Sequence, residues 1–492
     1  MKNRFRLSRL LLVGVTLIIQ GCISVGPDYK RLESSDIVPA SFSVGSGSTE
    51  KKEEVVTPIS STWWEFYQDP VLNDLVAKAL ENNTDIKLSI ARVEEADAHL
   101  QEVGAALFPT IDFKSNATRS RISRVSVIPV FPGLNPVRQI YSISLGTAFE
   151  LDFWGKIRRA REAASAQAIG TYYARDTVYL SLSGLIVTNY LLLRSLDAQL
   201  SVSRDNLRNR EEGLEITRRS LEQGSTSALD VYQAETAHSN LVAQIVDLSH
   251  QRAISQHQLA VLTGMLDLEL GEGNIKTLPI PPSPPAGLPS SLLVGRPDVR
   301  QAEEQVIAAT ANIGVAKAAL FPSIMLTTSF GRESISLGNL VKSAANIWTA
   351  GVNLNLPIFD AGRLLARLEQ ASSQQKQALI SYEGSIRTAF REVNDALISV
   401  RKSSEQEAAL QASEVSARKA LQVSENRYKY GYSAYLEVLD SQRIHNEVAL
   451  AVIRSRQNRL VATVDLFKAL GGGWEPESLR RSPSGFLEFF GD

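Results

Sequence analysis

The sequence contains very little of several residue types that define common protein classes. It has one cysteine among 492 residues, which excludes an intrachain disulfide and a thiolate metal cluster. Its 52 basic and 53 acidic residues nearly cancel and form no basic block, so we do not expect nucleic acid as a partner. The aromatic share is only 7%, whereas the apolar share is 44%, a balance typical of long packed helices.

Signatures of enzymes and resident metals are also missing from the sequence. No Gly-rich phosphate-binding loop precedes a predicted helix, and the glycines at 471–473 follow one as a stop signal. The five histidines form no close pair with carboxylates that would indicate a zinc hydrolase, and the three methionines form no cluster for a soft metal cargo. We therefore expect no enzyme activity, no cofactor and no bound metal.

Long hydrophobic runs are absent after residue 22. A membrane-spanning helix needs about 20 apolar residues, so we predict none, and any crossing of a membrane must use strands. Residues 10–19 form a short apolar run behind four basic residues, which predicts a signal peptide over residues 1–21. Gly21-Cys22 resembles the end of a bacterial lipobox and indicates acylation of Cys22, while an ordinary secretion signal is the alternative. Residues 22–62 would then form a lipidated tether.

What is present is a long internal repeat. Ala106-Leu107-Phe108-Pro109 returns as Ala319-Leu320-Phe321-Pro322, 213 positions later, and the turn at Gly224 returns at Gly431. Each half predicts the same order of helix, strand, strand, very long helix, turn and helix. A period of about 200 residues is too long for a solenoid unit and indicates a duplicated half-protomer. The predicted bounds are 63–264 for the first repeat, 265–296 for a Pro-rich equatorial connection, 297–473 for the second repeat and 474–492 for a tail.

Four segments alternate between apolar and polar residues as strands do. In residues 140–152 the odd positions carry the large apolar side chains and the even positions are small or polar. The predicted strands cover about 110–120, 140–152, 323–331 and 347–357. A soluble sandwich is the alternative, but open edges are not tolerated in lipid. Three chains would together supply twelve strands, within the range of outer-membrane barrels.

Very long helices follow the strands. Residues 157–223 contain no proline, and their apolar residues recur at alternating spacings of four and three. Antiparallel hairpins are predicted at about 157–263 and 363–470, each roughly 100 Å long at about 1.5 Å per residue. Helices at 229–262 and 298–320, stacked end to end, would match the length of one long helix. The fold class is therefore mainly α, a helical tunnel with a membrane β-barrel at one end.

This organisation resembles the outer membrane efflux factors of the TolC and OprM kind over nearly the whole mature chain. The resemblance implies a homotrimer with a twelve-stranded barrel in the outer membrane of a Gram-negative bacterium and a helical tunnel in the periplasm. It also implies a periplasmic adaptor and an inner-membrane pump, of the RND type, as partners. The segments that carry it are Cys22–Lys30, Trp63–Pro70, Gly295–Val299, Ala319–Pro322, Phe359–Arg363 and Val438–Arg443.

The resemblance places a gate at the tips of the hairpins, beside the turns at Gly224 and Gly431. Leu436, Glu437 and Asp440 lie in the first turns of the last helix, where threefold symmetry would make each a ring in a narrow lumen. The alternative is that acidic residues here only complement a helix N-terminus.

Two further residues, Tyr428 and Asp230, resemble partners in closing links between neighbouring hairpins. Asp230 also has capping-box spacing to Ser227, so both roles stay open for it. Ser433 occupies the place of an arginine in some members, which shifts the expected closure toward packing of Leu436.

Three functions fit these observations. The first is a passive outer-membrane duct of a tripartite efflux pump for antibiotics, detergents or solvents. The second is the duct of a type I protein secretion system. The third, from another class, is a coiled-coil lipoprotein that only tethers envelope layers.

Overall fold

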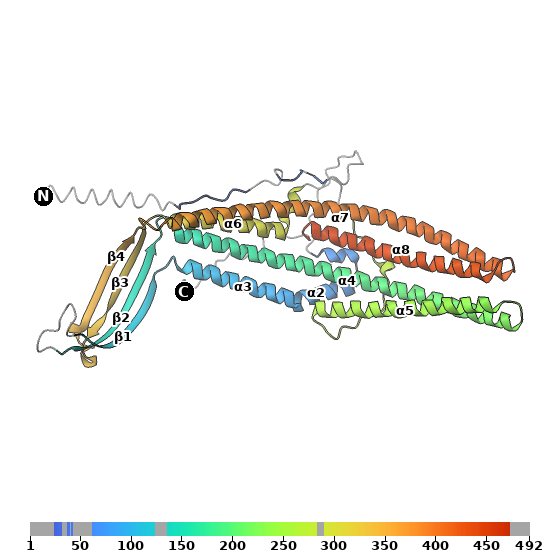
Figure 1. Cartoon of the computed structure of the whole chain (residues 1–492), viewed down its shortest axis with the longest axis horizontal. Coiled ribbons are helices and arrows are strands. Elements are labelled where there is room, and N and C mark those ends of the chain that lie inside the picture. The colour runs from blue at the N-terminus through green and yellow to red at the C-terminus, as the bar shows by residue number, and fades with distance from the viewer. Residues whose placement is uncertain are drawn as a thin grey trace.

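The chain forms a long rod of helices with a curved sheet at one end (Figure 1). The computed structural model describes residues 24–31, 37–39, 41–42, 62–123, 135–282 and 290–472. The signal peptide, Cys22, most of the tether and the tail at 474–492 lie outside these residues. The same series of two strands, a long helix and a shorter helix occurs twice in the described chain.

The sheet contains four antiparallel strands in the order β1-β2-β3-β4. Their bounds are β1 Thr110–Arg121, β2 Val137–Leu151, β3 Ser323–Ser334 and β4 Asn346–Asn355. The predicted strands are thus found, but β2 begins three residues earlier than predicted and β3 ends three residues later. Main-chain pairing carries both strands past the alternating segment, as at the Arg121–Val137 and Ser334–Tyr141 pairs. β4 ends earlier than predicted, before Pro357, which cannot donate to a ladder.

The two faces of the sheet differ in polarity. Residues that pair directly across antiparallel strands share a face, and Phe113, Leu145, Phe330 and Trp348 pair in one row across all four strands. All four side chains are largely exposed in the single chain. The next row, on the other face, contains Lys114, Ser144, Gly331 and Ile347. The sheet therefore has one face that suits lipid and one that is mostly polar or small.

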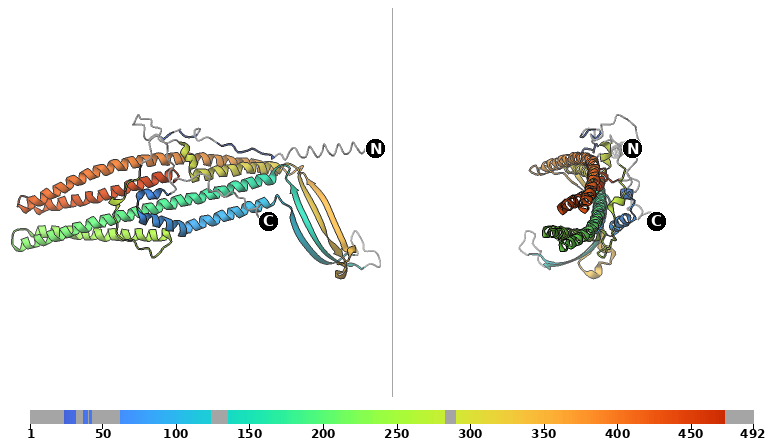
Figure 2. Two further views of the ribbon diagram at one scale, coloured as in Figure 1. Left: turned by 180° about the vertical axis from the view of Figure 1, so that it is seen from behind. Right: turned by 90° about the vertical axis from the view of Figure 1, so that its right-hand side faces the viewer.

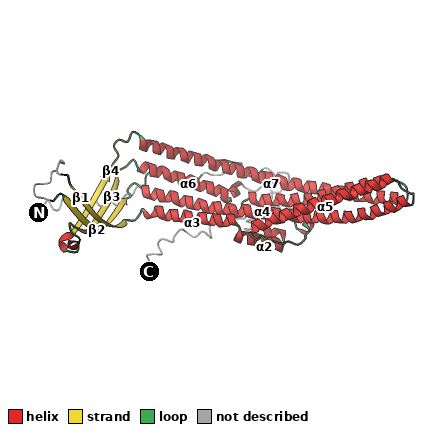
Figure 3. Cartoon of the chain, turned by 60° about the horizontal axis from the view of Figure 1, so that its bottom comes forward, coloured by secondary structure: helices red, strands yellow, loops and turns green. Residues whose placement is uncertain are grey.

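Two helical hairpins extend from the sheet (Figure 3). The first consists of α4 (Lys156–Glu222) and α5 (Ala228–Thr263), and the second of α7 (Arg363–Lys429) and α8 (Tyr435–Ala469). Both long helices start in the same way, after a glycine with positive φ. An aspartate before that glycine accepts main-chain N–H groups at the start of the new helix, Asp152 for α4 and Asp360 for α7.

Shorter helices complete the rod beside the long ones. They are α2 (Pro70–Asn82), α3 (Thr84–Ala105) and α6 (Pro297–Ala318). The expected end-to-end stacking of the helices near 229–262 and 298–320 is wrong, because α3 continues the row of α5 and α6 continues the row of α8 (Figure 1). The connection between α5 and α6 instead crosses α4, where its buried Ile275 and Leu278 join the main core.

The main core lies near the middle of the rod. It joins α2, α4, α5, α8 and the connection between the repeats, with Tyr67, Leu72, Ile186, Tyr190 and Leu460 among its fully buried side chains. Trp63 starts a separate 3-10 helix, Trp63–Tyr67, and Asp69 caps the following helix α2 at Pro70. The 3-10 helix, α2 and the connection between the repeats form an equatorial layer on the convex side of the rod (Figure 2).

Each hairpin carries a buried carboxylate at the level of this core. The Asp197 carboxylate on α4 accepts from Arg194 Nη1 at 2.8 Å, Arg252 Nε at 2.6 Å and the Gly273 N–H at 3.0 Å. In the second hairpin, Glu407 pairs with Arg459 at 2.9 Å and Arg456 at 3.4 Å. Arginines of both clusters also donate to carbonyls of the connection, including those of Leu270 and Leu278. Buried ion pairs therefore fasten the connection to both hairpins.

One helix of the described chain, α4, includes an 18-residue stretch that is long and apolar enough to span a membrane by length and composition alone. Half of that stretch is buried inside the protein. Since α4 supplies Ile186, Val187 and Leu191 to the main core, packing against other helices explains its apolar character.

Candidate channel gate

The two hairpin tips are built by matching turns. Gly224 and Gly431 adopt φ values of 77° and 74°, the left-handed conformation that ends a helix most easily at glycine. One residue later, the main-chain N–H of Ser225 bonds the Ser220 carbonyl at 2.9 Å, and that of Tyr432 bonds the Arg427 carbonyl at 2.8 Å. The structure thus places both predicted tip glycines at the point where the chain reverses.

Asp230 lies in the first turn of α5 and forms the capping box that its sequence spacing allows. Its carboxylate accepts from Thr226 Oγ1 at 2.7 Å, Ser227 Oγ at 2.9 Å and the Ser227 N–H at 3.2 Å. These hydrogen bonds, that of Thr226 foremost, favour the charged form and lower the pKa of Asp230 below its usual range. The structure therefore gives Asp230 a local role in its own turn.

Glu437 and Asp440 are each paired with an arginine of the same hairpin. Arg427, near the end of α7, lies 3.2 Å from Glu437 across the tip, and Arg443 lies 2.7 Å from Asp440. Arg443 also contacts Glu447 at 3.0 Å. Neither arginine is among the gate residues predicted from the sequence. The i,i+3 spacing of Asp440 and Arg443 could have identified the second pair, whereas the first requires the turn geometry.

Apolar side chains are exposed at the tips. Leu436 is 56% exposed, and its equivalent in the first hairpin, Leu229, is 63% exposed. Tyr430 and Tyr432 in the second turn are exposed as well. Because isolated exposed leucines are ordinary but a cluster at one end is not, the tips present a surface that suits contact with further copies of the chain.

The two tips pack against each other inside one chain. Leu214, Val231 and Ala234 of the first hairpin contact Tyr435 and Val438 of the second in one small core, with Tyr428 and Leu439 at its edge. The rings of Tyr428 and Tyr435 lie 5.1 Å apart at 49°. Burial, and then the nearby charge of Asp230, raise the pKa of Tyr428. The structure thus brings Tyr428 and Asp230 close together, although no hydrogen bond joins them among the described residues.

A groove separates α5 from α8 just above the tips. It has a volume of about 410 Å³ and is lined by residues of both helices, among them Leu436, Asp440 and Arg443. Arg210 of α4 also lines it, and burial lowers the pKa of that guanidinium. Among the described residues, no group of three or more histidine, cysteine or acidic side chains is arranged to hold a metal ion.

A family model described as outer membrane efflux protein matches residues 75–265 and 288–472 of this chain. The chain belongs to the outer membrane efflux protein family. Among its relatives is the toluene efflux pump outer membrane protein TtgC of Pseudomonas putida, 34% identical over 477 residues that cover 94% of this chain and 96% of the relative. The probable outer membrane lipoprotein SilC of Salmonella typhimurium is 32% identical, covering 95% and 99% of the two chains.

Solved channels share the fold. The open MtrE outer membrane channel of Neisseria gonorrhoeae superimposes with a TM-score of 0.80 at 29% identity, covering 92% of this chain and 98% of that one. The outer-membrane channel OprN gives a TM-score of 0.82 at 28% identity, covering 92% and 100%. The sequence-based assignment to outer membrane efflux factors is therefore confirmed. The family places the protein in the outer membrane as an efflux channel and decides among the three functions weighed from the sequence.

Proposed function

We propose that three copies of this efflux protein close into a passive outer-membrane duct whose periplasmic mouth is the ring of hairpin tips. The observation that carries this proposal is the pair of free edges of the sheet. β1 and β4 each pair on one side only within the described chain. An open edge leaves main-chain groups without partners in lipid, which costs several kcal/mol for each group. Three four-stranded sheets give a closed twelve-stranded barrel.

The helical part of the chain also has two edges, formed by α3 and α7, as the sheet has edges at β1 and β4. α3 packs on α4 and α2, while α7 packs on α6 and α8 on its own side of the rod. Exposed apolar side chains remain on both edge helices, including Leu88 and Ile90 on α3 and Ile380 and Val423 on α7. Rotation about one axis would bring α3 of each copy beside α7 of the next. The same symmetry then closes the sheet and the helical tunnel.

The names of the relatives support the choice of partner proteins and cargo for this chain. Several are named as outer membrane proteins of pumps for toluene, solvents or antibiotics. For this chain we propose a periplasmic adaptor and an inner-membrane pump of the RND type, with small apolar or amphiphilic molecules as cargo. The chain itself would bind no cofactor and carry out no reaction. A role in type I protein secretion has no specific observation in its favour.

Closure of the mouth would rest on the tip residues. With three copies, Leu436 would form an apolar ring, and Glu437 and Asp440 would form acidic rings whose charge Arg427 and Arg443 partly offset. Within each copy, Tyr428 would help to hold the two tips together, and Asp230 would cap the start of α5. The mouth would thus combine packing of Leu436 with salt links inside each hairpin.

Acylation of Cys22 would add a second anchor. Cys22 lies outside the described residues, but Ser24 contacts Gly155 and the Val25 N–H bonds the Trp154 carbonyl at 3.0 Å. These first described residues therefore contact the point where β2 passes into α4. An acyl group two residues earlier would reach the bilayer directly from this point.

Single-channel recording tests the proposal. The purified protein should migrate as a heat-modifiable trimer and form discrete channels in planar bilayers. A stable monomer without conductance would contradict the duct. Expression in a strain lacking its own outer-membrane efflux protein, with a matching adaptor and pump, should restore toluene or antibiotic tolerance.

A further inference from the structure

A second groove lies at the opposite end of the rod from the gate, where the helices meet the sheet. It has a volume of about 290 Å³ and lies between α3 and α4. Its lining residues are Leu100, Leu107, Arg158, Arg161, Glu162 and Ser165. This size is at the lower end of the range of roughly 300–1,000 Å³ for small-ligand sites.

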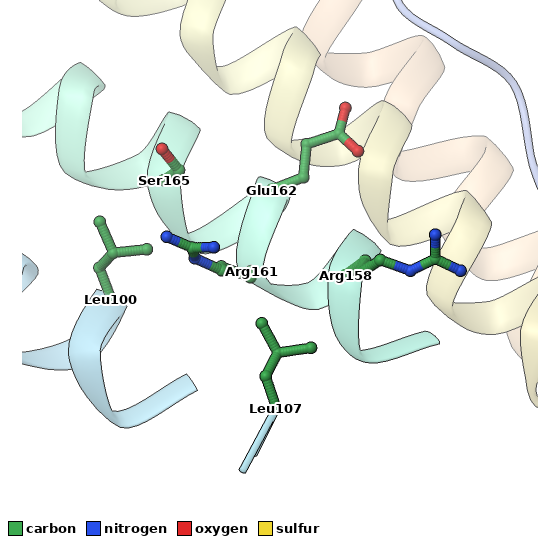
Figure 4. A pocket seen from close by; sticks show the side chains of 6 residues that line it. All are labelled: Leu100, Leu107, Arg158, Arg161, Glu162 and Ser165. Carbon is green, nitrogen blue, oxygen red and sulfur yellow. The ribbon is translucent and has the colours of Figure 1, made fainter. Parts of the chain in front are cut away.

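One of the basic side chains at this groove has no acidic partner among the described residues. Arg158 bonds Asp152 at 3.2 Å, and Glu162 bonds Arg159 at 2.8 Å. Arg161 makes no ion pair with any described residue, and its side chain lies against Gly104 of α3. In Figure 4, Arg161 turns toward Leu100 and Ser165, whereas Arg158 extends away from them. The groove therefore offers one free guanidinium beside leucine side chains and a hydroxyl.

The groove faces outward. Glu162, which lines the groove, pairs with Arg159, and Arg159 also pairs with Asp28 of the N-terminal segment at 2.5 Å. The described part of this segment lies outside the arc that the helices form in the end-on view (Figure 2). The groove thus opens to the exterior of the proposed tunnel rather than to its lumen.

The level of the groove along the rod matches a membrane surface. Leu107 lies just before the first residue of β1, and Arg161 lies in the second turn of α4, roughly 8 Å along the helix axis from its start. Phe108 is exposed, and Trp154 stacks on Phe321 at 4.7 Å at the same junction. Tryptophan side chains such as Trp154 gather at membrane–water interfaces. The first described residue, Ser24, also contacts this junction.

We propose that the α3–α4 groove binds an anionic glycerophospholipid of the periplasmic leaflet. Arg161 would donate a forked pair of hydrogen bonds to the phosphate, as guanidinium groups do with phosphate oxygens. The Ser165 hydroxyl would bond the glycerol oxygens, and Leu100 and Leu107 would contact the upper acyl chain. This inference goes beyond the proposed duct and rests on it for the position of the groove, which lies at the bilayer surface and on the outer side of the tunnel.

Native mass spectrometry of the full-length acylated trimer tests the site. The protein would be released from detergent micelles that contain phosphatidylglycerol and phosphatidylcholine with identical acyl chains. Wild type should retain phosphatidylglycerol in preference. Arg161→Gln should reduce that preference about fivefold, the contribution of one basic side chain near an anionic lipid surface. Arg92→Gln is the matched control, because Arg92 is an exposed arginine on α3 but lies about 27 Å from the start of β1.

Two further experiments distinguish a bound lipid from other occupants of the groove. An excess of inorganic phosphate should not displace the bound lipid, and Leu107→Gln should weaken lipid retention. Displacement by phosphate would show an anion site without lipid selectivity and overturn the proposal. Equal losses for Arg161→Gln and Arg92→Gln would indicate general electrostatic attraction and also overturn it.

Assembly of each variant is checked by heat-modifiable migration. If Arg161→Gln does not assemble, Arg161→Lys supplies the comparison, since it keeps the charge and loses the fork. Dissociation of the trimer without a change in lipid retention would assign the groove to a neighbouring copy and overturn the lipid site. A wild-type protein that inserts in bilayers and conducts but shows no lipid preference would refute this site alone and leave the duct intact.

Discussion

Replacing Asp197 by asparagine should destabilise the rod at its middle. The side chain of Asp197 is 1% exposed and its carboxylate accepts from two arginines and one main-chain N–H. The substitution leaves Arg194, which is 8% exposed, and Arg252, which is 20% exposed, without their counter-charge. Breaking a buried ion pair by removing one partner costs about 3–5 kcal/mol. We expect the loss for Asp197→Asn to fall within that range.

Asp205→Asn is the matched control for this prediction. Asp205 lies on α4 about two turns after Asp197. It pairs with Arg208, but both side chains are largely exposed. An exposed pair contributes about 0.2–1 kcal/mol. The assay is urea unfolding of the trimer by circular dichroism, with limited proteolysis of residues 265–282 as a local readout. If Asp197→Asn shifts the unfolding midpoint no more than Asp205→Asn does, the Asp197 cluster does not fasten the connection.

Three further predictions concern the anchor, the barrel and the tip. Cys22→Ser should abolish incorporation of labelled palmitate while the barrel still anchors the trimer, and equal labelling of both proteins would exclude acylation at this site. Leu145→Arg should impair membrane insertion by about 2–4 kcal/mol if its face meets lipid, whereas Ser144→Arg should be tolerated, and equal insertion would show that the faces are assigned wrongly. Because hydrogen bonds hold the pKa of Asp230 below its usual value, its capping is present above about pH 4 and lost as the pH falls through the lower folded pKa. Asp230→Asn should therefore make tip proteolysis less dependent on pH between neutral and acidic conditions, and an unchanged pH profile would contradict this role.

The long elements could be predicted because simple patterns along the chain define them. The stretch without proline at 157–223 is α4 to within one residue at each end. Alternation of apolar residues located all four strands, since one face of each strand is apolar and the other polar. Their ends could not be predicted as well, because pairing with a neighbour rather than side-chain pattern decides where a strand such as β2 begins.

Relations between distant segments could not be read from the sequence. The connection between the repeats crosses α4 because Arg194, Asp197 and Arg252 bind it there, and these residues come from two different helices without any common motif. The same holds at the gate. The sequence predicts the acidic residues Glu437 and Asp440, but the arginine across the turn, Arg427, follows only from the geometry of the tip.

Single-channel conductance of the Leu436→Ala, Asp440→Ala double variant tests the central claim most directly. Removing Leu436 takes away the exposed apolar side chain at the proposed mouth, and removing Asp440 takes away a carboxylate and leaves Arg443 with Glu447 alone. The account predicts higher conductance than wild type and weaker block by divalent cations, in a trimer that still assembles. Unchanged conductance and unchanged block in an assembled trimer would mean that the tips do not form the constriction.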